Sequence, residues 1–202
     1  MSKTIDYYLA PQSPWSYLGH ERFGRIAQAA GSRVNLLPTD LGRVFAVSGG
    51  LPLAKRPPQR QTYRLVELRR HADYLGAILN LHPTYFPVSG DAAARLIIAI
   101  DRHDGADAAM AFAGRVMSGV WAGQRNIADT ETLAAMLAQA GLPERRLADA
   151  EVAEIQARYD ANTRKAIDIG VFGAPTYVID GEMFWGQDRL DFVERSLAGS
   201  TA

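Results

Sequence analysis

Apolar and polar residues alternate at the start of the chain and then recur at helical spacing, which predicts a strand followed by a helix. Alternation over residues 3–10 is typical of a strand with one buried face. From Pro14 onward apolar residues recur every three or four positions until Gly31, a common helix stop. Residues 34–37 form a second apolar run. Residues 3–38 are therefore expected to form a β-α-β unit.

The middle of the chain shows mainly helical patterns. Residues 45–62 contain paired glycines and paired prolines and are expected to form a long loop. Alanine-rich helical periodicity dominates the segment after this loop. Helices are predicted at about 58–75, 91–103, 107–121, 130–140 and 147–169.

The C-terminal part returns to strands. Residues 176–180 and 182–185 are strand-like and are joined through Asp180-Gly181, a strong hairpin signal. An amphipathic helix begins near Leu190. Pro175 stands directly before the first of these strands, where thioredoxin-like folds carry a cis-proline, so its peptide bond is expected to be cis.

The order β-α-β, helical block, β-β-α defines a fold class. It predicts an α/β, thioredoxin-like fold with a helical domain inserted between its two halves. In this prediction residues 1–42 and 170–202 form the thioredoxin-like domain, and residues 43–169 form the inserted helical domain. The two ends of the chain are then expected to share one sheet.

Composition narrows the possible functions. The 202 residues carry 22 Lys and Arg against 22 Asp and Glu, which argues against nucleic acid or an anionic membrane as the main partner. The chain has no cysteine, so it has neither a disulfide framework nor a redox thiol of its own, and the cytoplasm is the expected location. The 4 histidines show no metal-binding spacing, and residues 69–71 (Arg-Arg-His) are expected to form a solvated helix face.

The segment QSPWSYLG (12–19) joins the first strand to the first helix. Ser13 suits an N-cap and Pro14 suits the first helical position. A plain cap is one interpretation of Ser13. A second is that the serine stabilises an anion, because a helix N-terminus offers unpaired N–H groups and a positive dipole end. A serine hydrolase is disfavoured, since no G-x-S-x-G motif is present.

Several segments together resemble the 2-hydroxychromene-2-carboxylate isomerases, which are relatives of kappa-class glutathione transferases and of DsbA oxidoreductases. These segments are YYLAPQSPWSYLG, TDLGRVF and VFGAPTYVIDGEMFWGQDRLDFVE, together with the inserted helices. The resemblance implies a glutathione-dependent isomerase of aromatic catabolism, expected to be a homodimer. Glutathione thiolate would add to a 2-hydroxychromene-2-carboxylate-like substrate, the ring would open and a bond rotate, and elimination would return glutathione.

The resemblance also assigns roles to individual residues. Ser13 is the catalytic residue and donates a hydrogen bond to the glutathione sulfur. Asp188 meets the ammonium of the γ-glutamyl end, and a helix cap is the alternative role for this residue. The glutathione-binding positions are Ser13, Ala174, Trp185, Gly186, Gln187 and Asp188.

On the substrate side the chain departs from the family pattern. The candidates are Ala54, Lys55 and Ser89. Family members tend to have asparagine where Ala54 and Ser89 stand, and many have an aspartate where this chain has Leu9-Ala10. Lys55 is expected either to meet a substrate carboxylate or to be solvated. These departures bear on the natural substrate more than on the glutathione site.

Two other functions remain compatible with the sequence. One is a kappa-like transferase that releases the glutathione conjugate. The other is a DsbA-like module that binds extended peptides without redox chemistry. Trp121 and Tyr63 could line an aromatic pocket, although core packing is the expected role of both.

Overall fold

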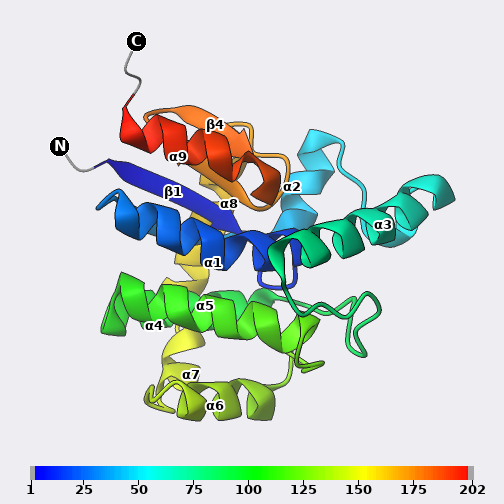
Figure 1. The fold of residues 1–202 in the computed structure, drawn as a ribbon. Helices are drawn as coiled ribbons and strands as arrows, with labels where there is room; N and C mark the ends of the chain where they lie inside the picture. The colour runs from blue at the N-terminus through cyan, green and yellow to red at the C-terminus, as the bar shows by residue number, and fades with distance from the viewer. Residues whose placement is uncertain (1–2, 200–202) are drawn as a thin grey trace.

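Four strands form one mixed sheet in the order β2-β1-β3-β4 in the computed structural model, which describes residues 3–199 (Figure 1). β1 (Thr4–Leu9) pairs in parallel with β2 (Arg33–Pro38). β3 (Thr176–Ile179) pairs antiparallel with both β1 and β4 (Glu182–Trp185). The two ends of the chain therefore share one sheet, as the sequence predicts.

The helices lie in the segments that connect the strands and in the segment after β4. α1 (Pro14–Ala29) joins β1 to β2, and η2 (Gln187–Arg189) and α9 (Leu190–Ala198) follow β4. Figure 1 shows α4 and α5 on the side of α1 away from α9, and α6 and α7 beyond them. Between β2 and β3 lie α2 (Leu41–Ser48), η1 (Leu53–Lys55), α3 (Pro58–Leu75), α4 (Asp91–Asp104), α5 (Ala106–Trp121), α6 (Thr130–Gln139), α7 (Arg146–Ala150) and α8 (Ala153–Asp168).

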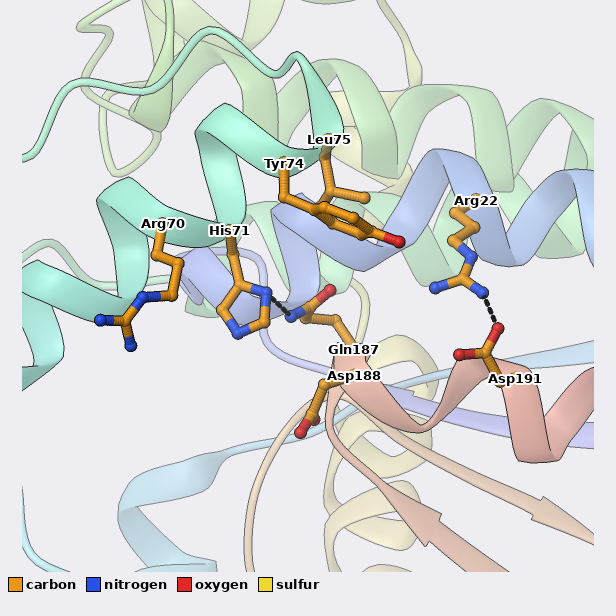
Figure 2. Close-up of a pocket in the computed structure, with 8 residues that line it drawn as sticks. All are labelled: Arg22, Arg70, His71, Tyr74, Leu75, Gln187, Asp188 and Asp191. Atoms are coloured by element: carbon orange, nitrogen blue, oxygen red, sulfur yellow. Dashed lines mark hydrogen bonds and ion pairs between the residues drawn. The ribbon is translucent and has the colours of Figure 1, made fainter.

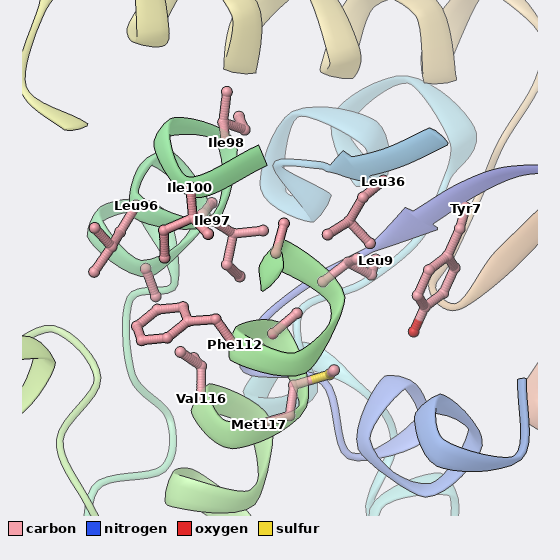
Figure 3. Close-up of a cluster of buried hydrophobic side chains, with 14 of the residues drawn as sticks. Tyr7, Leu9, Leu36, Leu96, Ile97, Ile98, Ile100, Phe112, Val116 and Met117 are labelled. Carbon is pink, nitrogen blue, oxygen red and sulfur yellow. The ribbon is translucent and has the colours of Figure 1, made fainter. Parts of the chain in front are cut away.

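One apolar cluster connects the sheet with the inserted helices. Tyr7 and Leu9 of β1 belong to the same buried cluster as Ile97 of α4 and Phe112 of α5 (Figure 3). The residues of α4 from 96 to 100 are all buried, which is typical of a helix enclosed on most sides. β1, α4 and α5 thus share one apolar core. The division of the chain into two domains stays a prediction.

The structure corrects two of the predicted elements. The expected loop at 45–62 begins inside α2, and it also contains η1. α2 forms because the Asp40 carboxylate caps it, accepting hydrogen bonds from the amides of Gly42 at 2.8 Å and Arg43 at 3.3 Å. The helix expected at 147–169 is interrupted between α7 and α8, where Val152 has an extended backbone with ψ of 145°.

Two local predictions near the C-terminus are confirmed. Asp180 and Gly181 have φ of 51° and 86°, as the two central residues of a type I′ hairpin require. The Ala174-Pro175 peptide bond is cis, and so is the unpredicted Phe86-Pro87 bond. Across residues 3–199, no helix is both long and apolar enough to cross a membrane.

Candidate active site

Ser13 lies where β1 passes into α1. Its backbone is extended, with φ of −79° and ψ of 125°, and its Oγ accepts a hydrogen bond from the Ser16 amide at 3.2 Å. The serine hydroxyl points toward the carbonyl oxygen of Ala174, 3.4 Å away. An O–H···O hydrogen bond is normally 2.5–3.0 Å long, so the hydroxyl proton is only weakly engaged. Ser13 caps the helix through its oxygen and keeps its proton available for a better acceptor.

The segment around Pro175 holds the end of β4 next to this serine. Thr176 pairs with Trp185 in the sheet, and the Gly186 amide donates to the Pro175 carbonyl at 2.9 Å. Gly186 has φ of 104°, which favours glycine, and a Cβ there would come within 2.4 Å of the Asp188 carboxylate. The close approach of backbone to Asp188 therefore requires a glycine at this position.

Trp185 covers the chain just before Ala174. Its indole is half-exposed and packs against Phe172, with ring centroids 4.7 Å apart. A Cβ on Gly173 would come within 2.4 Å of the indole nitrogen. The missing side chain at Gly173 therefore makes room for the indole beside the predicted glutathione-binding backbone.

Gln187 connects η2 to two helices. Its side chain is buried and its amide donates to Nδ1 of His71 on α3 at 2.9 Å (Figure 2). Its Cβ would be only 2.8 Å from a Cβ placed on Gly19, so α1 and η2 are in close contact. Because the Gln187 side chain is already bonded to His71, a ligand would bind the backbone N–H of Gln187 rather than its side chain.

His71 also contacts the Trp15 ring edge-on, with ring centroids 5.8 Å apart. The expectation that His71 belongs to a solvated helix face is therefore wrong.

Asp188 lies on the rim of a cavity of about 290 Å³ between α3 and η2. Its carboxylate pairs with Arg189 at 2.7 Å, and both side chains are about half-exposed. In Figure 2 the carboxylate points away from Tyr74 and Leu75. The cavity is lined by Arg22, Arg70, His71, Tyr74, Leu75, Gln187, Asp188 and Asp191. The Asp188 carboxylate is thus accessible to a ligand, and a cationic ligand group would compete with Arg189 for it.

The predicted substrate residues are more loosely connected to the site. Ala54 and Lys55 are exposed on η1. Ser89 is exposed, and its hydroxyl bonds the carboxylate of Asp91 at 3.0 Å at the start of α4. Within residues 3–199, no hydrogen bond or ion pair links any of the three to Ser13.

The loop that carries Ser89 nevertheless reaches the site through residues not singled out in the sequence. A Cβ on Gly90 would come within 2.1 Å of Oε1 of Gln12, the residue before Ser13. The Trp121 indole donates to the Gln12 carbonyl at 3.3 Å and packs on Phe86.

The two aromatic residues considered for a pocket differ in burial. Trp121 is fully buried, which confirms its predicted core role. Tyr63 is 59 % exposed, so the expectation that it packs in the core is wrong. Its position on α3 leaves the ring on the surface rather than in the apolar cluster.

The fold and this site define a class of protein. The model of the DSBA-like thioredoxin domain family matches residues 4–198, nearly the whole chain. A 2-hydroxychromene-2-carboxylate isomerase of Pseudomonas putida is 32% identical over 197 residues, covering 96% of this chain and 93% of the relative. Within the DsbA-like class, the chain belongs to the 2-hydroxychromene-2-carboxylate isomerase family.

Two further proteins are similar to this chain. A solved structure of a 2-hydroxychromene-2-carboxylate isomerase superposes with a TM-score of 0.77 at 28% identity, covering 96% of this chain and 94% of that one. A Caenorhabditis elegans protein named glutathione S-transferase kappa 1 is 24% identical, covering 94% of this chain and 88% of the relative.

Proposed function

We propose that this protein is a glutathione-dependent isomerase of aromatic catabolism, acting on a 2-hydroxychromene-2-carboxylate-like substrate. The observation that carries the proposal is the Ser13 hydroxyl, placed at the N-terminus of α1 and beside Ala174 with its proton weakly engaged. The isomerase names of the relatives support the reaction, and the transferase name of the kappa relative supports glutathione.

The residues around Ser13 fit a thiol tripeptide. Gln12 Oε1 and Ser16 Oγ, on either side of Ser13 in the chain, are buried and have no hydrogen-bond partner in the described chain, so the surroundings of Ser13 are polar. Gly186, without a Cβ, lets the Asp188 carboxylate lie close to the backbone at the start of η2. Bound glutathione would supply the thiolate that adds to the substrate and leaves again. Ala174 would hold its cysteinyl unit, and Trp185 would line it.

Ser13 is proposed to stabilise the thiolate form. A free thiol titrates near pH 8.5, and lowering its pKa by about two units requires roughly 2.7 kcal/mol. The end of α1 supplies typically ~0.3–1 kcal/mol and up to ~2. A hydroxyl hydrogen bond to the charge adds about 1.5–3 kcal/mol. The helix end and Ser13 together are therefore sufficient, whereas either alone is marginal.

The γ-glutamyl end is assigned to the start of η2. The first N–H groups of a helix lack intrahelical acceptors, so the backbone of Gln187 and Asp188 suits a carboxylate. The Asp188 side chain suits the ammonium, for which it must exchange its contact with Arg189. Ala54, Lys55 and Ser89 stay predictions for the substrate side, as do the homodimer and the cytoplasmic location.

A turnover assay with and without glutathione tests the proposal. Purified protein is given 2-hydroxychromene-2-carboxylate, and ring opening is followed by absorbance. We expect isomerisation that requires glutathione and leaves its concentration unchanged. Stoichiometric loss of glutathione to an electrophilic chloronitrobenzene, without isomerisation, would instead indicate a transferase. If neither reaction occurs and peptide binding is unaffected by glutathione, the protein is a binding module.

A further inference from the structure

Arg64 lies against two aromatic rings in the middle of α3. Its guanidinium carbon is 5.3 Å from the Phe86 ring centre and 5.7 Å from the Trp121 ring centre. The two rings also contact each other, with centroids 4.7 Å apart. A guanidinium held over aromatic faces keeps its planar edge free for a carboxylate.

Arg64 has no anionic partner within the part of the chain that the structure describes. Among residues 3–199 it forms neither an ion pair nor a hydrogen bond, although it is partly buried. Arg146, by contrast, is buried between the carboxylates of Asp104 and Asp149. A partly desolvated cation without a counter-ion is unfavourable, so this arrangement points to an anion that the chain itself does not supply.

The surroundings of Arg64 are positive. Burial, with a smaller contribution from Arg56, lowers the pKa of Arg64 to about 10. Arg64 therefore still carries its charge at neutral pH. The Arg56 side chain is bonded to the carbonyl of Leu51 at 2.8 Å, so Arg56 adds positive potential while its own donor is in use.

The aromatic platform under Arg64 is connected to the catalytic serine. The Trp121 indole donates to the carbonyl of Gln12, and Gln12 directly precedes Ser13. The cation, the rings and the predicted thiolate position therefore belong to one contiguous part of the site.

We propose that Arg64 binds the carboxylate of the aromatic substrate and orients it toward the sulfur held by Ser13. The inference deepens the proposed function and rests on it for the identity of the substrate. The ligand class is a planar aromatic or conjugated carboxylate, since the site offers a guanidinium fork next to aromatic rings. Lys55, the sequence candidate for this role, is exposed on η1.

Three variants on α3 test this assignment. Arg64→Met removes the charge, and Arg64→Lys keeps the charge but loses the planar fork. Arg69→Met is the matched control, because Arg69 is exposed on the same helix. At saturating glutathione, KM for 2-hydroxychromene-2-carboxylate should rise roughly tenfold to a hundredfold in Arg64→Met. The rise should be smaller in Arg64→Lys and absent in Arg69→Met, while glutathione affinity is unchanged in all three.

A binding experiment separates this inference from the proposed function. Calorimetry with cinnamate and with cinnamamide compares a carboxylate with its neutral amide. Wild type should prefer cinnamate, and Arg64→Met and Arg64→Lys should each reduce that preference. If wild type does not isomerise but shows this Arg64-dependent preference, the proposed reaction fails and the carboxylate site stands. If wild type isomerises and neither Arg64 variant changes KM or cinnamate binding, Arg64 is a packing residue and the inference is overturned.

Discussion

The hydroxyl oxygen of Ser13 lies 3.4 Å from the carbonyl oxygen of Ala174, although 161 residues separate the two along the chain. β1 and β3 are antiparallel neighbours with Tyr8 opposite Thr176, so the end of β1, after which α1 begins, lies beside the start of β3. An extended thiol peptide bound along Ala174 would therefore place its sulfur within reach of both the serine proton and the end of the helix.

Ser13→Ala should raise the pKa of bound glutathione thiol by about one to two units, because roughly 1.5–3 kcal/mol of hydrogen bonding to the anion is lost. Glutathione affinity near neutral pH should change little, since most proposed contacts are to the peptide backbone and termini. Thiolate absorbance in the ultraviolet, followed against pH, measures the shift. Activity near pH 7 should fall with the thiolate fraction and partly recover at higher pH.

The same substitution removes a helix cap, so a second cap serves as the control. Asp129 caps α6 by accepting from the Thr132 amide at 2.8 Å. Asp129→Ala and Ser13→Ala should each lower stability by about 1 kcal/mol. Only Ser13→Ala should move the thiol pKa. An unchanged titration in Ser13→Ala would leave the serine as a cap and nothing more.

Asp188→Asn should weaken glutathione binding about fivefold, or about 1 kcal/mol. This modest size follows from the exposure of the carboxylate, which is about 47%. Arg189→Gln should keep or improve affinity, because Arg189 competes for the same carboxylate. Calorimetric titration of both variants compares them. Equal losses of affinity in the two would show that the Asp188–Arg189 pair supports the fold of η2 instead of receiving the ammonium.

Local signals made much of the fold predictable. The hairpin follows from Asp180-Gly181, whose backbones both adopt positive φ, and the β-α-β start follows from its periodicity. The sequence pattern does not predict α2, because α2 is a short helix beside a glycine- and proline-rich stretch. Its main sequence signal is a single cap, Asp40. Short helices set by one side chain carry too little pattern to be recognised from periodicity.

The site was predictable only in part. The sequence indicates Ser13 and Asp188 because their segments resemble a family, and each also has a physical reason to lie at a helix start. The contact of Gln187 with His71 joins residues that are 116 positions apart, and no local sequence pattern predicts it. Arg64 looks like any arginine of a polar helix until the fold places two rings beneath it. Partners from distant segments depend on tertiary packing, which the sequence pattern does not specify.

Gly19→Ala should disturb the site through the contact between α1 and η2. The added methyl would lie 2.8 Å from the Cβ of Gln187 and 3.0 Å from the Tyr177 hydroxyl, so η2 must shift. We expect a loss of about 1–3 kcal/mol in stability from overpacking, together with weaker glutathione binding. Urea unfolding and calorimetry measure the two effects.

Gly24→Ala on the same helix provides the comparison. The nearest atom to its added methyl is the Cε of Met110 at 4.0 Å. This variant should gain about 0.5–1 kcal/mol from helix propensity and keep glutathione affinity. If Gly19→Ala were as stable as Gly24→Ala and bound glutathione normally, the close approach of α1 would not position η2.

His20 should make stability depend on pH. The imidazole is buried in the core, where Nε2 donates to the Met110 carbonyl at 2.9 Å and Nδ1 accepts from the Tyr7 hydroxyl at 3.2 Å. Both contacts suit the neutral ring, because a carbonyl can only accept and one ring nitrogen is left as the acceptor. Burial lowers the pKa of His20 below its usual value.

The sign of the effect depends on which state binds the proton. Unfolded His20 takes up a proton near pH 6.5 while the folded residue stays neutral, so protonation favours the unfolded chain. Above that pH its contribution is fully present. As the pH falls from about 6.5 toward the folded-state pKa, stability should decrease by up to about 1.4 kcal/mol per pH unit.

His20→Gln, which cannot titrate, tests this prediction. The variant should be less stable than wild type at pH 7.5, and its stability should lack the pH dependence that His20 contributes. Urea unfolding of both proteins between pH 7.5 and 5 measures the gap between them, which must narrow on acidification. A gap that stays constant, or a His20 proton resonance that titrates at or above pH 6.5 in the folded protein, would show that the buried ring accommodates the charge.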